Sequence, residues 1–189
     1  LSFLQQHYSI PAKFLLEPAP NSVQLEQILQ CAMSAPDHGS LQPFRFLVIE
    51  GDARHELAQV FETATRQRSA DVDEATVAKQ KGKPLRSPMI IVVIASIDKK
   101  SSIPEIEQIL CAGCAAQHIQ LACTSLGFGS IWLTGANSYD IYVNQSLGLD
   151  LHERIVGFIY IGTPESTPAQ KNRNPALAIT RHWSSAHRH

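Results

Sequence analysis

The sequence lacks any concentrated positive charge. Its 16 Lys and Arg residues are balanced by 17 Asp and Glu residues, which leaves a formal net charge of −1. The nearest approach to a basic cluster is the short, interrupted run of Lys79, Lys81 and Lys83. Binding to nucleic acid or to an anionic membrane draws on clustered cations. The composition therefore argues against either as the main partner.

Long apolar runs and dense cysteines are also missing. The longest apolar stretch, Pro88 to Ile97, is too short to span a bilayer and predicts a buried strand instead. The first residues do not show the pattern of a secretion signal, which is a positively charged segment followed by an apolar one. The 4 cysteines are sparse and lie in apolar helical sequence, unlike those of a disulfide-stapled secreted domain. We therefore expect a cytoplasmic protein.

The hydrophobic pattern predicts one α+β domain over residues 1–189, with a C-terminal arm from about residue 163. Expected helices cover Leu1 to Tyr8, the segment after Asn21 as far as Pro36, Gly51 to about Arg68, Pro104 to about Leu126, and about Asp140 to Leu147. Expected strands are Arg45 to Ile49, Ile90 to Ala95, Ser130 to Leu133 and Ile155 to Ile161. Because this order is not a regular strand–helix alternation, it favours helices packed on a central sheet. The polar segment Ser69 to Lys83 is expected to be mobile.

Polar groups and turn residues gather between the apolar elements in four patches. These are His7-Tyr8-Ser9, Ser34 to Pro43, Gly127 to Gly135, and Lys171-Asn172-Arg173. Singly, each has an ordinary structural explanation, such as a helix end, a polar loop, a tight turn or solvated tail charges. The glycines of the third patch do not form a dinucleotide-type phosphate loop, because the GxGxxG spacing is absent and a helix precedes them.

Taken together, the patches resemble a known family. The order of these segments is similar to that of the nitroreductase family, and most to that of its YdjA-like branch. The segments are the His7-Tyr8-Ser9 start, the EPAP connector, APDHGSLQPFRFLVIEG, GFGSIWLTGA, IVGFIYIGTP and a late Lys-x-Arg. The resemblance covers nearly the whole chain. It implies an α+β fold with a central, mostly antiparallel sheet flanked by helices. It also implies an entwined homodimer that holds FMN at its two-fold interface.

The resemblance also implies where the cofactors are bound. The phosphate of FMN would be held by His7, Tyr8, Ser9, Lys171 and Arg173, and Ser34 stands at a further FMN-binding position. The flavin ring would lie near Pro36, His38 and Gln42 and against Trp132, Leu133 and Thr134. The nicotinamide cofactor is associated with the turn that consists of Ala122, Cys123, Thr124, Ser125, Leu126 and Gly127.

The implied reaction is reduction of a nitroaromatic, quinone or related acceptor by NADH or NADPH, with ping-pong hydride transfer through the flavin. Donors and cations near the ring would stabilise the negative charge of the reduced flavin. Because the isoalloxazine carries the hydride, the protein needs no nucleophile or acid–base pair. We predict no catalytic side chain and no metal site.

The sequence departs from the family at charged positions. His7 and Tyr8 stand where the family has two arginines, and Ser34 replaces a third arginine of the branch. A charged hydrogen bond contributes roughly 1.5–3 kcal/mol, so the loss of one predicts FMN binding weaker by roughly tenfold to a hundredfold. Compensating charges are available at Lys13, Lys171 and Arg173. A degenerate FMN-binding protein with little activity therefore stays open as the alternative.

Two other chemistries are weaker interpretations. Cys111-x-x-Cys114 resembles a redox pair, but it lies inside an apolar helix, whereas a reactive cysteine needs an exposed helix N-terminus. His182, His187 and His189 crowd the C-terminus without the supporting polar residues of a metal site. His118, on the long helix, is interpreted as a structural residue.

Overall fold

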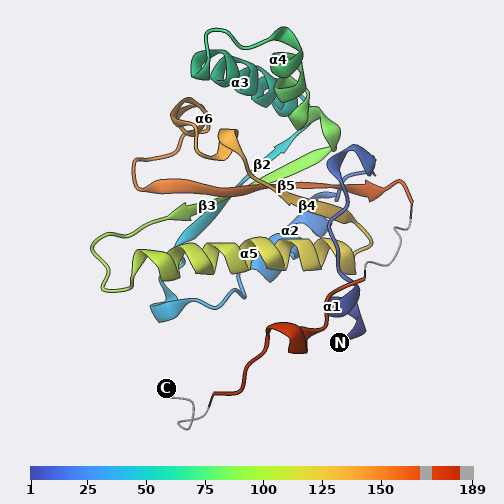
Figure 1. Ribbon diagram of the computed structural model, residues 1–189, viewed down its shortest axis with the longest axis vertical. Helices are drawn as coiled ribbons and strands as arrows, with labels where there is room; N and C mark the ends of the chain where they lie inside the picture. The colour runs from blue at the N-terminus through green and yellow to red at the C-terminus, as the bar shows by residue number, and fades with distance from the viewer. Residues whose placement is uncertain (167–171, 184–189) are drawn as a thin grey trace.

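The computed structural model describes residues 1–166 and 172–183. Its centre is a 5-stranded sheet with the order β1-β5-β3-β2, in which β4 also pairs with β5. The strands are β1 (Leu15–Leu16), β2 (Phe44–Glu50), β3 (Met89–Ser96), β4 (Gly129–Leu133) and β5 (Glu153–Pro164). Every pairing is antiparallel, and Figure 1 shows β5 crossing the middle of the molecule. The predicted antiparallel α+β architecture is confirmed.

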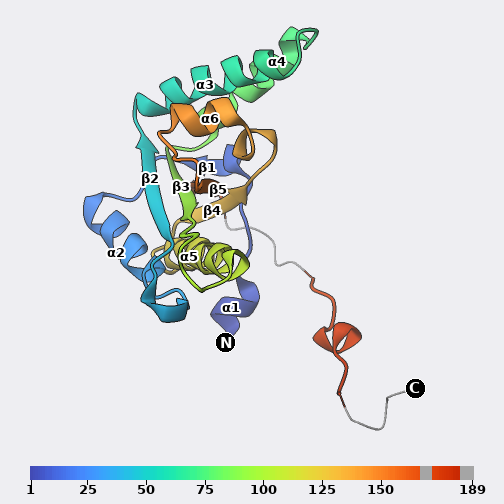
Figure 2. The ribbon, with the colours of Figure 1, turned by 90° about the vertical axis from the view of Figure 1, so that its left-hand side faces the viewer.

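Helices cover both faces of this sheet. On one face lie α2 (Ser22–Ala32) and α5 (Glu105–Ser125), and on the other lie α3 (Ala53–Arg68), α4 (Glu74–Lys81) and α6 (Ile141–Ser146) (Figures 1 and 2). A short helix, α1 (Ser2–Gln6), precedes them near the end of α5. Asn21 begins α2 with a reciprocal capping box to Gln24. Long α5 begins after Pro104, as the sequence predicts.

The apolar run of β3 sits at the centre of two hydrophobic cores. Ile91, Val93 and Ala95 pack toward α2 and α5, while Ile90, Val92 and Ile94 pack toward α3 and α6. All six side chains are fully buried. A strand that is covered on both faces has no solvent-facing side, so apolar and polar residues do not alternate along it. This explains why the run of apolar residues in β3 is continuous.

The segment after α3 is more ordered than its composition predicts. Within Ser69 to Lys83, expected to be mobile, the structure contains α4. The Asp73 side chain caps this helix by accepting from the backbone N–H of Thr76 over 2.7 Å. Ion pairs join it to α3, with Arg66–Glu74 at 2.7 Å and Lys81–Glu62 at 2.7 Å. This helix was not predicted, because the ion pairs that stabilise it lie between two helices.

Smaller differences concern boundaries. The first helix ends at Gln6, so His7 and Tyr8 are extended rather than helical. The two-residue strand β1 was not predicted, and β5 is longer than expected because it also pairs with β1 through Thr163 and Pro164. Across residues 1–166 and 172–183, none of the helices combines the length and apolarity that crossing a membrane requires.

Candidate functional site

Two cavities lie at opposite ends of β4. A cavity of about 500 Å³ is lined by Tyr8, Thr124, Gly127, Phe128 and the first residue of β4, Gly129, and we call it the polar cavity. A cavity of about 570 Å³ lies at the other end, where Trp132 contributes its indole, and we call it the apolar cavity. At about 3.4 Å per residue, β4 separates its two ends by about 14 Å. An elongated ligand along this strand would therefore reach both ends.

Next to the polar cavity, the two chain ends that the family resemblance assigns to phosphate binding are in contact. The His7 ring nitrogen Nδ1 lies 3.1 Å from the Thr124 hydroxyl. From the other end of the chain, the Arg173 guanidinium donates to the carbonyl oxygens of His7 and Gln5. Burial, and then the charge of Arg173, lower the pKa of His7 below its usual value. Both effects favour the neutral form of His7, which offers a hydrogen bond to a ligand.

The N-terminal segment is held tightly against the start of β4. The backbone N–H of Ile10 donates to the carbonyl oxygen of Ser130 over 3.0 Å. A Cβ atom on Gly129 would lie 2.6 Å from Ile10 Cδ1 and 2.7 Å from Leu15 Cδ2. Gly129 is therefore required for close packing, and it fixes His7 and Tyr8 beside the cavity.

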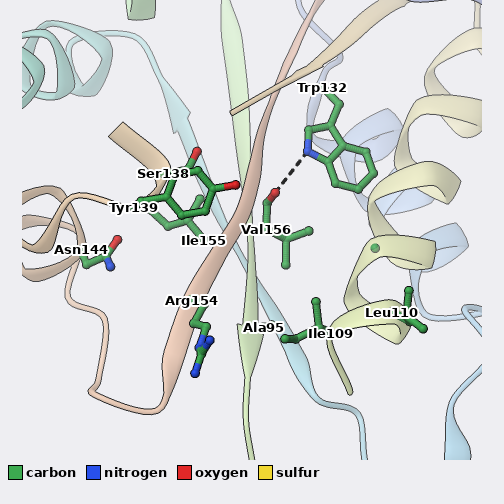
Figure 3. Close-up of a pocket in the computed structure, with 11 residues that line it drawn as sticks. Ala95, Ile109, Leu110, Trp132, Ser138, Tyr139, Asn144, Arg154, Ile155 and Val156 are labelled. Carbon is green, nitrogen blue, oxygen red and sulfur yellow. Dashed lines mark hydrogen bonds between the residues drawn. The ribbon is translucent and has the colours of Figure 1, made fainter. Parts of the chain in front are cut away.

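At the other end of β4, Trp132 has a fixed orientation. Its indole Nε1 donates to the carbonyl oxygen of Val156 over 3.2 Å (Figure 3). Val156 is the extra residue of a β-bulge, since Val93 pairs with Gly157 and Ile94 pairs with Ile155. Leu133 packs instead toward the α3 side of the sheet, and Thr134 is exposed. In the predicted segment Trp132 to Thr134, the Trp132 indole thus forms an apolar wall on one side of the sheet, and an exposed polar turn begins at Thr134.

The apolar cavity lies between α5 and the segment after β4 (Figure 3). Ile109, Leu110 and Gly113 of α5 form one wall. The opposite side is formed by Ser138, Tyr139 and Asn144, with Arg154 of β5 close by. Arg154 is paired with Glu105 over 2.8 Å, so the positive charge at this cavity is neutralised.

Unpartnered polar atoms concentrate around the end of β4. Among the described residues, four buried side-chain atoms have no hydrogen-bond partner: Ser130 Oγ, Asn137 Nδ2, Ser138 Oγ and Asn144 Oδ1. All belong to the 130–144 segment. A buried polar group without a partner costs about 1–3 kcal/mol, so their concentration in one segment points to a ligand or a partner chain at this place.

The loop that contains Pro36, His38 and Gln42 lies elsewhere in the single chain. None of these residues lines either of the two cavities. His38 Nδ1 lies 2.6 Å from Glu107 Oε2, at the start of α5. The Asp37 carboxylate accepts from the backbone N–H groups of Leu41 and Gln42 at 3.1 and 2.7 Å and so holds the loop. One chain therefore does not bring this loop to Trp132.

The other predicted residues are divided between surface and core. Ser34 donates to the Cys31 carbonyl oxygen over 2.7 Å and lies 3.2 Å from His118 Nδ1. In the predicted nicotinamide turn, Thr124 and Gly127 line the polar cavity, Ser125 and Leu126 are exposed, and Ala122 and Cys123 are buried in the core. Ser9 is half-buried next to Tyr8. Lys171 lies outside the described residues.

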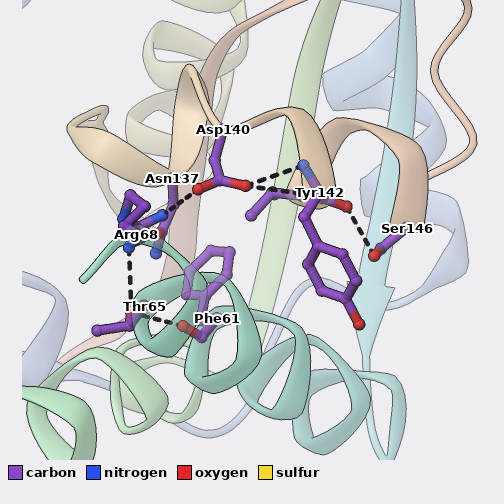
Figure 4. Close-up of polar contacts among 8 residues, drawn as sticks. Phe61, Thr65, Arg68, Asn137, Asp140, Tyr142 and Ser146 are labelled. Atoms are coloured by element: carbon purple, nitrogen blue, oxygen red, sulfur yellow. Dashed lines mark hydrogen bonds and ion pairs between the residues drawn. The ribbon is translucent and has the colours of Figure 1, made fainter. Parts of the chain in front are cut away.

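An ion-pair network supports the segment after β4, and no motif predicted it. Arg68, at the end of α3, pairs with Asp140 over 2.5 Å and donates to Asn137 Oδ1 over 2.9 Å (Figure 4). The Asp140 carboxylate also caps α6 by accepting from the backbone N–H of Tyr142 over 2.9 Å. The sequence signal was only the capping pattern at Asp140, because its partner Arg68 is distant in the chain. Ser138 was missed for the same reason.

The alternative chemistries find no support in the geometry. Burial raises the pKa of the Cys111 thiol to about 11, and Cys111 and Cys114 are both free within α5. Unreactive core residues are the better interpretation. Within the described ranges, which exclude His187 and His189, there is no cluster of three or more His, Cys, Asp or Glu residues suited to a metal.

Comparison with known proteins identifies relatives over most of the chain. A sequence model described as "Nitroreductase family" matches residues 4–163. The Escherichia coli K12 protein named "Putative NAD(P)H nitroreductase YdjA" is 40% identical over 154 residues, which cover 82% of this chain and 83% of that one.

Solved structures share the fold. A nitroreductase-like family protein from Bacillus cereus superimposes with a TM-score of 0.83 at 23% identity, over 97% of this chain and 95% of that one. A nitroreductase structure from Desulfovibrio desulfuricans, described as a complex with FMN, has a TM-score of 0.74 at 24% identity over the same shares, 97% and 95%.

Proposed function

The chain belongs to the nitroreductase family, and we propose that it is an FMN-dependent oxidoreductase that uses NADH or NADPH to reduce quinones, nitroaromatics or related acceptors. Its relatives support an oxidoreductase in general terms, and one fold neighbour is described as an FMN complex. The observation that carries the proposal is the concentration of unpartnered buried polar atoms in residues 130–144, the segment that consists of β4 and the residues after it.

The residues present fit the two ends of FMN. Thr124 lines the polar cavity and its hydroxyl contacts His7, while Arg173, whose guanidinium has five N–H groups and uses two on carbonyl oxygens, contacts the backbone of His7. Glu165 is the acidic residue of the lining, and the Arg173 charge lies nearby to offset it. The phosphate would be bound there. The ring would lie along β4, near Trp132, Leu133 and Thr134, where the indole is already oriented. Ser130, on the same strand, has a hydroxyl free to bond to the ligand between these ends.

The chain's own contribution is binding, orientation and exclusion of water. FMN, when bound, supplies the hydride chemistry between nicotinamide and acceptor. Gly127, at the polar cavity, is the proposed contact for the nicotinamide cofactor. Because no acid–base pair is required, the side chains need only hold the reacting molecules in contact.

A second copy of the chain is part of the proposal. On α5, Ile106 and Leu110 are 61% and 59% exposed, and the C-terminal segment exposes Leu177, Ile179 and Trp183. Figures 1 and 2 show this segment leaving the body of the molecule, where one chain cannot bury it. A homodimer with an interface above about 2,000 Å² would cover these surfaces. It would also bring the partner's copy of the loop around His38 to the flavin. Because all four cysteines are free, the proposed compartment is the reducing cytoplasm.

The test is the visible absorbance spectrum of the purified protein, with and without added FMN. Bound-flavin bands that bleach on anaerobic addition of NADH or NADPH, and return with 1,4-naphthoquinone, are the expected result. Bands that appear but do not bleach would favour a degenerate FMN-binding protein, which the lowered pKa of His7 at a phosphate position makes the second candidate. Absence of any bands at high FMN would overturn both.

A further inference from the structure

A third cavity lies where β2 begins and β3 ends. Its volume is about 620 Å³, and it is lined by residues 41–43, residues 96–100 and His152. Backbone hydrogen bonds tie these three segments together. The N–H of Ser96 donates to the carbonyl oxygen of Pro43 over 2.9 Å, and the N–H of Ile97 donates to that of His152 over 3.0 Å. This cavity, which we call the basic cavity, is therefore a fixed feature of the fold.

The turn that carries the two lysines of this cavity is anchored by Gln108 of α5, which is 2% exposed. The amide oxygen of Gln108 accepts from the N–H of Asp98 over 2.8 Å. Its Nε2 group donates to the carbonyl oxygens of Asp98 and Ile103 over 3.1 and 2.9 Å. Lys99 and Lys100 therefore start from a backbone that is already ordered. A ligand that binds them does not have to order this turn as well, which lowers the entropy cost of binding.

The segment 41–43 is held in an unusual backbone conformation. Gln42 has a φ of 48°, in the left-handed region that residues other than glycine seldom adopt. The Asp37 carboxylate stabilises this conformation by accepting from the N–H of Gln42 over 2.7 Å. The Gln42 side chain is exposed at the cavity, so its amide can bond to a ligand. Strained backbone of this kind is concentrated at ligand-binding segments.

The lining of the basic cavity carries an excess of positive charge. Lys99 and Lys100 contribute two ammonium groups, and neither forms an ion pair within the described part of the chain. Asp98 is the acidic residue of the lining, and its carboxylate accepts from the backbone N–H of Lys100 over 2.8 Å. The imidazole of His152 adds a further group that can donate a hydrogen bond. In the apolar cavity, by contrast, the cation is already paired.

These features suit a phosphorylated nucleoside. A phosphate monoester carries roughly −1.5 to −2 charges at pH 7, and lysine ammonium groups bind phosphate as point charges. Leu41, Pro43 and Ile97 give the same cavity an apolar wall against which a base can lie. NADPH differs from NADH by one such phosphate, on the ribose of its adenosine end. A cavity with an excess of positive charge therefore favours NADPH over NADH.

We propose that the basic cavity binds the adenosine end of NADPH, with the 2′-phosphate held by Lys99 and Lys100, and so sets a preference for NADPH over NADH. That NADPH is the hydride donor rests on the proposed function. Gln42 belongs to the loop around His38 that the proposed dimer brings to the flavin, so the cavity would open beside that flavin. The dinucleotide would then contact the basic cavity of one subunit and Gly127 of the other. Binding of the adenosine end itself requires no flavin.

The experiment compares two adenosine nucleotides by isothermal titration calorimetry on the protein as isolated. Adenosine 2′,5′-bisphosphate reproduces the phosphorylated end of NADPH, whereas 5′-AMP lacks the 2′-phosphate. The double substitution Lys99→Gln with Lys100→Gln removes both charges, and Lys99→Arg with Lys100→Arg keeps them. Both lysines are exposed, so neither pair should lower the unfolding midpoint. Lys79→Gln is the control, because it removes an exposed lysine of α4 that lines none of the three cavities.

We expect the bisphosphate to bind about tenfold more tightly than 5′-AMP, the effect of one charged hydrogen bond. The glutamine pair should abolish this difference, and the arginine pair and Lys79→Gln should preserve it. No binding of the bisphosphate, equal affinities of the two nucleotides, or a difference that survives in the glutamine pair would overturn the proposal. The expected difference in a protein whose flavin bands do not bleach with NADPH would instead refute the proposed function alone.

Discussion

The indole Nε1 of Trp132 donates to the backbone carbonyl oxygen of Val156 over 3.2 Å. This bond depends on the next residue, because a Cβ atom on Gly157 would lie 2.0 Å from the same nitrogen. The bulge at Val156 and the missing side chain at Gly157 therefore fix the ring that separates the predicted flavin segment from the apolar cavity. A local backbone irregularity thus determines the shape of the candidate site.

The first prediction concerns the two glycines that face this indole. Gly157→Ala should displace Trp132 and lower the free energy of unfolding by about 1–3 kcal/mol, as overpacking does. Gly113→Ala places its Cβ at an ordinary contact distance of 3.8 Å and removes a glycine from a helix interior. It should therefore be neutral or stabilise the protein by up to about 1 kcal/mol. Urea denaturation, with Trp132 fluorescence in the Trp183→Phe background, measures both. Equal stability of the two variants would show that Gly157 is not needed to accommodate the indole.

The second prediction concerns stability against pH. The hydrogen bonds from Arg45, at 2.6 and 2.7 Å, lower the pKa of the buried Glu153 carboxyl to about 2. A carboxyl whose pKa is lower in the folded state stabilises the protein above its unfolded pKa, and this contribution disappears as the pH falls through the folded pKa. Glu153→Gln should therefore cost about 2–4 kcal/mol at pH 7. The difference from the parent protein should shrink as the pH falls from about 4.5 toward about 2.

Chemical denaturation at several pH values between 7 and 2.5 provides the measurement. Glu74→Gln is the matched control, because Glu74 also pairs with an arginine but is exposed. Its loss should change the free energy of unfolding far less than the loss of Glu153, because water and salt screen an exposed pair. If the effect of Glu153→Gln stayed constant over the whole pH range, the lowered pKa of Glu153 would not be its cause.

The third prediction concerns the support of the segment that contains Ser138. Arg68→Ala would leave Asp140 and Asn137 without their shared donor. Because the ion pair is partly exposed, the expected loss is about 1–3 kcal/mol. Arg66→Ala, which breaks exposed ion pairs on the same helix, should cost less than Arg68→Ala. In a double-mutant cycle, Arg68→Ala should cost less once Asp140→Asn is present, since asparagine still caps α6 but carries no charge. Strict additivity would contradict the network.

Sequence reasoning succeeded where the signal is local and failed where it depends on distant contacts. The continuous apolar run of β3 and the Pro-to-Gly limits of α5 identify these elements without knowledge of their neighbours. Helix α4 was missed because Arg66 and Glu62 of α3 stabilise it. The family resemblance assigned His7 and Arg173 to one phosphate site, and the structure shows them in contact although 166 positions separate them. Nothing in the sequence distinguished Ser138 from a surface turn residue, because its burial depends on the early end of β4.

The last prediction tests the departure of this chain from the family at His7. The pKa of His7 is lowered by burial and by Arg173, which opposes a positive charge at the proposed phosphate site. His7→Arg should lower the dissociation constant of FMN about tenfold, since it adds one charged hydrogen bond. His55→Arg, an exposed substitution on α3, should leave it unchanged. Flavin fluorescence titration gives both constants. If His7→Arg had no effect while Arg173→Ala still weakened binding, the phosphate would be held by Arg173 without His7, and the missing family arginine would not limit FMN affinity.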